Sequence, residues 1–164
     1  MTSRKVTYTQ HHSGIIESKV ADSMYEFLRD NVPWVDSVKS RRSNRITRKG
    51  WAVPPEPDNL VVQSIENLVN ESLNKVCPSE SYLLLGTYAN FYQSGEDWAP
   101  SHSHPGMVQL VISLGATRVL KVGTKNYSLA SGDTILFGAS AHELMRDPSV
   151  IEGRISIATF MKRL

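Results

Sequence analysis

Residues 101–115 read SHSHPGMVQLVISLG, so a pair of histidines stands directly before an apolar, β-rich run. Such a run, bounded by glycine, predicts a strand. His102 and His104 are separated by one residue, so on an extended chain both side chains project to the same face and can bind one metal ion. Imidazole suits iron, zinc, copper or nickel, so the pair predicts a metal site without choosing the metal.

The apolar run belongs to a series of short β-rich runs in the second half of the chain. Glycine or polar turns separate these runs, which cover residues 81–92, 107–115, 117–123, 125–130, 133–138 and 154–164. Before them, apolar side chains recur at helical spacing over residues 15–32 and 57–76, and a proline follows each stretch. Two helices followed by closely spaced strands predict an α+β fold whose strands close into a barrel or sandwich.

The length of 164 residues is that of one domain with a sizeable core. We expect residues 1–164 to form this domain, with the helices and a basic segment in residues 1–80 and the strand-rich core in residues 81–164. Hydrophobic residues make up 40% of the chain and charged residues 21%, as in soluble globular proteins. The sequence has no apolar run of the ~18 residues that span a bilayer and no apolar signal core at its N-terminus. With a single cysteine, Cys77, an intracellular protein, cytoplasmic or nuclear, is expected.

A third histidine, His142, follows the predicted strand 133–138 and lies forty residues after His102. In a barrel, such a separation returns the chain beside the strand from which it started, so His142 is a candidate third ligand. The alternative is that all three are polar loop histidines. Glu143 is not expected to add a carboxylate, because successive residues of a strand face opposite ways. His11 and His12 lie in a polar N-terminal segment and are not expected to join the site.

Residues 39–50, KSRRSNRITRKG, contain six basic residues and no acidic one. Such a segment can bind the phosphates of DNA or RNA, and a solvated basic loop or edge strand is the alternative. The candidate substrate residues are Arg41, Arg42, Arg45, Arg48, Lys49 and Trp51. Trp51 can stack on a base, although an ordinary place in the core or in a turn is the better account of a single tryptophan.

Taken in order, the motifs of residues 90–160 resemble those of the AlkB-like family of 2-oxoglutarate- and Fe(II)-dependent dioxygenases. The family's N-x-Y-x-x-G motif matches Asn90, Tyr92 and Gly95, and its H-x-D motif falls on His102 and His104. Its S-L-G and G-D strands match residues 113–115 and 132–133. Its distal histidine falls on His142, and its R-x-N-x-T motif on Arg154 and Ser156.

The resemblance implies a double-stranded β-helix, of the jelly-roll or cupin-like kind, preceded by the two helices. It implies that His102 and His142 bind Fe(II), with His104 at the third metal position. Arg154 would bind the distal carboxylate of 2-oxoglutarate as a bidentate fork. Asn90, Tyr92 and Ser156 would complete the cosubstrate site. The implied activity is oxidative demethylation of an alkylated nucleic-acid base, which such enzymes flip into the pocket.

The sequence departs from this family where His104 replaces the carboxylate of H-x-D, where Phe160 replaces a second arginine, and where Ser156 replaces an asparagine. Two alternatives follow from these departures. One is a non-catalytic AlkB-like binding module. The other is a cupin-like three-histidine dioxygenase that does not use 2-oxoglutarate, in which Gln109 is the nearest polar candidate for the cupin glutamate.

Overall fold

The computed structural model describes residues 9–36, 48–77 and 82–164, which form two antiparallel sheets and two helices. The helices are α1 (Ser18–Asn31) and α2 (Leu60–Val76). In chain order the strands are β1 (Gln10–His12), β2 (Lys49–Ala52), β3 (Tyr82–Tyr92), β4 (Ala99–His102), β5 (Val108–Gly115), β6 (Arg118–Val122), β7 (Lys125–Leu129), β8 (Thr134–Phe137), β9 (His142–Leu144) and β10 (Arg154–Arg163).

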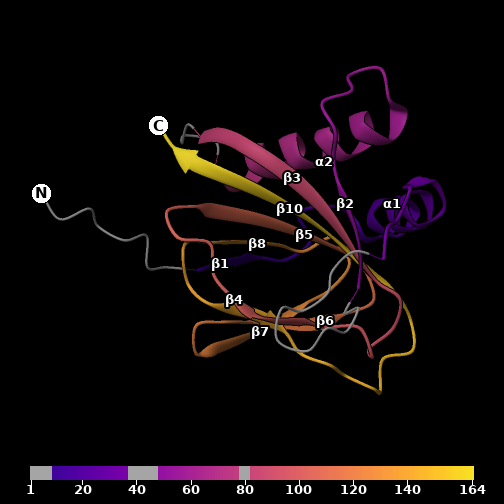
Figure 1. Ribbon diagram of the computed structural model, residues 1–164, viewed down its shortest axis with the longest axis vertical. Helices are drawn as coiled ribbons and strands as arrows, with labels where there is room; N and C mark the ends of the chain where they lie inside the picture. The colour runs from indigo at the N-terminus through magenta and orange to yellow at the C-terminus, as the bar shows by residue number, and fades with distance from the viewer. Residues whose placement is uncertain (1–8, 37–47, 78–81) are drawn as a thin grey trace, which may run out of the picture.

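The large sheet has the strand order β1-β8-β5-β10-β3-β2, and the small sheet has the order β4-β9-β6-β7. The small sheet lies on one side of the large sheet, and both helices cover the other side (Figure 1). The predicted helices and the six predicted strands are confirmed, with boundaries that differ by up to three residues. The result is a jelly-roll-like arrangement of mostly antiparallel strands with two helices on its outside.

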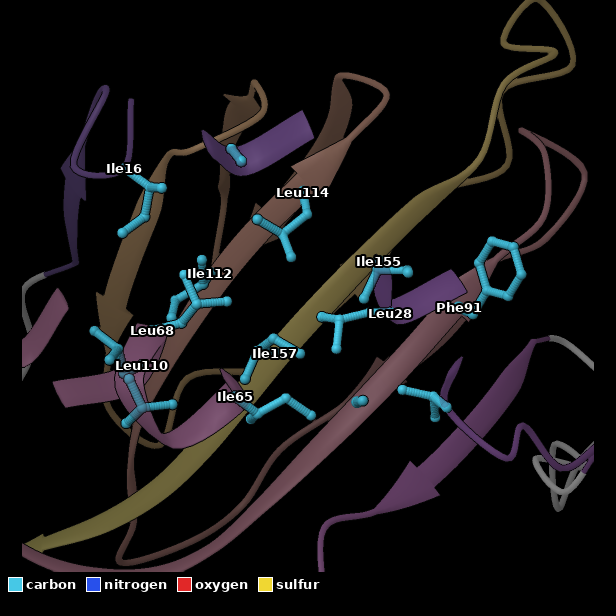
Figure 2. Packing of buried hydrophobic residues seen from close by; sticks show 14 of the residues in the cluster. Ile16, Leu28, Ile65, Leu68, Phe91, Leu110, Ile112, Leu114, Ile155 and Ile157 are labelled. Atoms are coloured by element: carbon cyan, nitrogen blue, oxygen red, sulfur yellow. The ribbon is translucent and has the colours of Figure 1, made fainter. Parts of the chain in front are cut away.

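The central strand β10 separates two hydrophobic cores. Its odd-numbered residues Ile155 and Ile157 are fully buried and pack toward the helices, together with Leu28 of α1 and Ile65 of α2 (Figure 2). Helix α2 begins at an N-cap asparagine, Asn59, whose side chain accepts hydrogen bonds from two backbone amides of the first turn. The even-numbered residues of β10 face the small sheet, where a second and smaller apolar cluster includes Ala158.

Four short strands were not among the runs predicted from the sequence. Strands β4 and β9 have four and three residues, too few for an alternating pattern to stand out. Strand β2 begins at the end of the basic segment, and β1 lies in the polar N-terminal segment. Because β1 pairs with β8 and β2 pairs with β3, residues 1–80 contribute two strands to the large sheet.

The Gly132–Asp133 motif has a structural role. Gly132 adopts a φ of 94° against the backbone of Ile16, where a Cβ atom would collide. The buried carboxylate of Asp133 accepts hydrogen bonds from the backbone amides of Gly14 and Ala130, and from His11 Nε2 at 3.0 Å. The motif therefore ties the N-terminal segment to the turn before β8.

Gly95, from the N-x-Y-x-x-G motif, joins two loops at one end of the sheets. Its amide donates to the carbonyl of Val150 at 2.7 Å, and its carbonyl accepts from the amide of Asp147 at 2.8 Å. A Cβ atom on Gly95 would overlap the backbone of Asp147. Within the described residues, no helix is long and apolar enough to cross a membrane.

Gly95→Ala is expected to destabilise the fold by on the order of 3 kcal/mol, because the added methyl group meets rigid backbone. Gly86→Ala is the matched control, since a Cβ atom there meets nothing within 4 Å, and it should be neutral or slightly stabilising. Urea unfolding of both variants measures the difference. Equal stability of the two variants would contradict the close approach at Gly95.

Candidate functional site

The three histidines predicted from the sequence converge at the pairing of β4 with β9. His102 and His142 are register partners across these two strands, as expected from their separation along the chain. His104 lies two residues beyond His102. The ligand atoms of the three side chains all lie within 4.8 Å of one another, which is close enough for one ion to contact all three.

Two of these imidazoles are oriented by the same local contact. His102 Nδ1 lies 2.6 Å from the carbonyl oxygen of Pro100, and His142 Nδ1 lies 3.3 Å from that of Ser140. A proton on Nδ1 that is donated to the carbonyl leaves Nε2 with its lone pair, which is the form that binds a metal. The rings of Phe137 and Phe160 flank the cluster, with centroids 4.8 Å from His142 and 4.9 Å from His104.

The environment keeps two of these histidines, His104 and His142, neutral. Burial, reinforced by the neighbouring His102, lowers the pKa of His142 to about 4. Burial and His102 also lower the pKa of His104. Neutral imidazole is the protonation state required for metal binding, so no proton has to leave either ring at neutral pH.

The histidines open onto a cavity of about 280 Å³ between the two sheets. Its wall is formed by Arg48, Tyr88, Asn90, Tyr92, Ala99, His102, His104, Gln109, Val111, Leu120, Phe137, His142, Leu144, Arg154, Ser156, Ala158 and Phe160. No aspartate or glutamate is among these residues. Glu143 faces away from the cavity, as predicted, and lies 3.9 Å from Lys121 in an ion pair.

Strand register orders the cavity wall into rows across the large sheet. Phe137, Gln109 and Phe160 form one row at the end of the cavity where the phenyl rings contact the histidines. The next rows are Val111, Ala158 and Tyr88, and then Ser156 and Asn90. Arg154 and Tyr92 close the series. The wall therefore changes from aromatic to polar to cationic along β10.

Arg154 brings a buried positive charge to the far end of the cavity. The residue is 2% exposed, and its Nε donates to Ser113 Oγ at 2.8 Å. Its Nη2 has no hydrogen-bond partner within the described residues. Burial lowers the pKa of Arg154 to about 10, so the side chain is still cationic at neutral pH. A buried guanidinium with an unpaired donor fits the carboxylate of a ligand.

Two further arginines surround the ring of Tyr92. The guanidinium carbons of Arg48, Arg118 and Arg154 lie 5.9, 5.8 and 5.5 Å from its centroid. Arg48 Nε also donates to Asn90 Oδ1 at 3.1 Å. Arg118 donates to the backbone carbonyls of Ser94, Asp97 and Met145, and so fixes the loops beside the cavity.

The structure brings most of the predicted site residues together. The cavity wall includes His102, His104, His142, Asn90, Tyr92, Arg154, Ser156 and Arg48. Lys49 and Trp51 are on the other face of β2, since alternate residues of a strand point in opposite directions. Lys49 pairs with Asp36 at 3.2 Å, and Trp51 packs against the helix-side core. The expectation that Trp51 faces the substrate pocket is therefore wrong. Arg41, Arg42 and Arg45 lie outside the described residues.

Several cavity residues were not identified from the sequence as parts of the site. Tyr88 and Phe137 were not singled out, and Gln109 was considered only as a substitute for the cupin glutamate. Arg118, which holds the loops beside the cavity, was not singled out either. Tyr88 lies two residues before Asn90 on the same strand face, so alternation alone would have placed it beside the site. Phe137 and Gln109 required the pairing of β5 with β8, which the sequence does not specify.

No family model matches the chain, and no curated protein matches it. Solved structures do share its fold. A viral collagen prolyl hydroxylase from Paramecium Bursaria Chlorella virus-1, in a 2OG complex, is 14% identical, with a TM-score of 0.63 over 94% of this chain and 96% of that one. A prolyl-4-hydroxylase from Pseudomonas putida is 11% identical, with a TM-score of 0.61 over 98% and 94%.

A 2OG-Fe(II) oxygenase family protein from Burkholderia pseudomallei is 16% identical, with a TM-score of 0.65 over 94% of this chain and 84% of that one. At these identities the similarity concerns the fold. The chain therefore has the jelly-roll-like fold found in 2-oxoglutarate- and Fe(II)-dependent oxygenases, over nearly its whole length.

The buried His142 predicts a pH dependence for the metal-free protein. Between its ordinary pKa of 6.5 and its folded pKa of about 4, the unfolded chain binds a proton that the folded chain does not. The free energy of unfolding should therefore be highest above pH 6.5 and fall toward pH 4, by on the order of 3 kcal/mol. Urea unfolding at several pH values measures this loss. The loss should shrink in His142→Gln, and an unchanged slope in that variant would assign the titration to another group.

Proposed function

We propose that this chain is an Fe(II)- and 2-oxoglutarate-dependent oxygenase whose sheets form a double-stranded β-helix and whose iron is held by His102, His104 and His142. The observation that carries the proposal is the presence, in one cavity, of three converging histidines and a buried arginine with an unpaired donor. The fold that the chain shares with 2-oxoglutarate-dependent oxygenases supports it.

The two ends of the cavity bind different groups, the cosubstrate carboxylate at one end and the metal ion at the other. Arg154 binds the distal carboxylate of 2-oxoglutarate through its paired N–H groups. Asn90, Tyr92 and Ser156 line the wall between Arg154 and the histidines, where they position the cosubstrate. When bound, Fe(II) supplies the activation of oxygen that couples decarboxylation of 2-oxoglutarate to hydroxylation of the substrate.

The three-histidine set changes the charge of the site. Three neutral imidazoles leave Fe(II) one unit more positive than two histidines and a carboxylate would. A dianionic cosubstrate compensates for part of that charge, because its carboxylates bind between the metal site and Arg154. We expect the redox potential and the metal preference to differ from those of a site that contains a carboxylate ligand.

For the substrate we propose an alkylated base of DNA or RNA, demethylated as in the AlkB-like family. Its support is the position of Arg48, which belongs to the basic segment and lines the cavity. A prolyl peptide is the second candidate, favoured by the fold shared with two prolyl hydroxylases and by the aromatic side chains of Tyr88 and Phe160 in the wall.

The test is metal analysis combined with turnover of 2-oxoglutarate. Protein purified without oxygen is loaded with Fe(II), and succinate is measured with methylated DNA, methylated RNA, a proline-rich peptide or no substrate. Stimulation of succinate formation by one substrate supports the proposal and identifies the class. Iron binding without 2-oxoglutarate binding favours the cupin-like three-histidine dioxygenase, and 2-oxoglutarate binding without turnover favours the non-catalytic module.

Arg154→Lys is expected to weaken 2-oxoglutarate binding by about 10- to 100-fold, because lysine keeps the charge but loses the fork. Arg154→Met should abolish binding. Calorimetric titration under nitrogen measures both affinities, and circular dichroism checks the fold. Arg146→Lys, outside the cavity wall, is the control. Unchanged affinity in Arg154→Met would show that another group binds the carboxylate.

His104→Asp is expected to lower turnover, because the new carboxylate would lie against the ring of Phe160 instead of in water. His104→Ala should weaken metal binding by removing one ligand. Iron affinity and succinate formation are measured for both variants. Higher turnover in His104→Asp than in the wild type would mean that His104 replaced an ancestral carboxylate ligand and weakened the site.

A further inference from the structure

Gln109 of β5 is the polar residue in an otherwise aromatic row of the cavity wall. Its register partners are Phe160 on β10 and Phe137 on β8. The residue is 2% exposed, and its Nε2 has no hydrogen-bond partner within the described part of the chain. A buried amide donor without an acceptor is destabilising, so its presence calls for an explanation.

The position of Gln109 places this donor at the histidine end of the cavity. The ring of Phe160 contacts His104, and the ring of Phe137 contacts His142. Gln109 stands between these two phenyl rings in the sheet. Arg154, the other cavity residue with an unpaired donor, lies six residues from Phe160 along β10, which corresponds to about 20 Å between Cα atoms. The two donors therefore mark opposite ends of one cavity.

The acceptor for Gln109 has to arrive with a ligand. Among the residues that the structure describes, no carboxylate side chain lines the cavity. The histidines that receive a metal ion through Nε2 have no acceptor left, since Nδ1 of His102 and of His142 faces a backbone carbonyl. A neutral donor between two phenyl rings suits the oxygen of a carboxylate or a keto group, which is an acceptor small enough for an apolar enclosure.

We propose that Gln109 is a binding residue whose Nε2 donates to an anionic oxygen of the ligand at the three histidines. In the proposed oxygenase, on which this inference rests, that oxygen belongs to the 2-oxo acid end of 2-oxoglutarate. Arg154 and Gln109 then recognise the two ends of the same dianion. The binding energy gained at Gln109 offsets the stability lost by burying its amide in the free protein.

Two substitutions at this position and one control test the assignment. Gln109→Leu removes the amide at similar volume, and Gln109→Glu replaces the donor by a carboxylate of the same shape. Thr134→Val is the matched control, because Thr134 Oγ1 is also buried without a partner in the described residues but lies outside the cavity wall. The dissociation constants of Co(II), of 2-oxoglutarate and of azide with the Co(II) protein are measured, together with Tm.

Gln109→Leu is expected to bind Co(II) like the wild type, to bind 2-oxoglutarate and azide about 10- to 100-fold more weakly, and to melt a few degrees higher. Gln109→Glu should weaken both anions further through charge repulsion. Thr134→Val should raise Tm alone.

Anion affinities within twofold of the wild type in Gln109→Leu would overturn the inference and leave Gln109 a structural residue. A parallel loss of Co(II) affinity would also overturn it, since Gln109 Oε1 would then be a metal ligand. If the wild-type Co(II) protein binds azide but not 2-oxoglutarate, the proposed function fails and the azide affinities still decide the role of Gln109. If the wild-type Co(II) protein binds neither azide nor 2-oxoglutarate, both the proposed function and the binding role of Gln109 are overturned.

Discussion

The alternation of side-chain direction along β10 is the constraint on which the rest of the structure depends. This strand is hydrogen-bonded to β3 on one side and to β5 on the other. Its odd-numbered residues, such as Ile155 and Ile157, are fully buried on the helix side, and each contributes about 2 kcal/mol by burial. A slip of one residue would place Arg154 in that core and the isoleucines in the cavity. The packing that attaches the helices therefore also directs Arg154 and Phe160 into the cavity.

The charge of the cavity makes the metal and the ligand depend on each other. Three guanidinium groups surround Tyr92, no carboxylate of the described residues lines the wall, and Arg48 contributes to the lowered pKa of His142. A divalent cation added to this field is disfavoured unless an anion accompanies it. In the proposed oxygenase, a dianion would satisfy both ends, with one carboxylate at Arg154 and the other at the metal site. Tight metal binding is therefore expected to require the cosubstrate.

The sequence predicted those features that repeat along the chain or lie close together in it. Both helices and six strands have periodic apolar side chains, and the His102–His104 pair needs only an extended backbone. His142 was placed correctly because a barrel returns β9 beside β4. The strands of three or four residues were missed because they are too short to show alternation. Trp51 was a candidate substrate residue but packs in the helix-side core, which was its alternative, whereas Arg48 lines the pocket. Gln109 and Phe137 meet through strand pairing, which depends on the whole sheet.

The two main departures from the AlkB-like pattern meet in space. The rings of His104 and Phe160 are 4.9 Å apart and edge-to-face, so a neutral ring packs on a neutral ring where the family has a carboxylate and an arginine. The two replacements are compatible with each other, because the two neutral rings pack together. Neither replacement alone indicates this compatibility. Within the described residues, no hydrogen bond joins the three histidine rings, and burial disfavours protonation of His104 and His142. Three desolvated imidazoles that converge without bonding one another are stabilised only when an ion binds them. The cluster therefore favours a working three-histidine site over the remnant of a lost one.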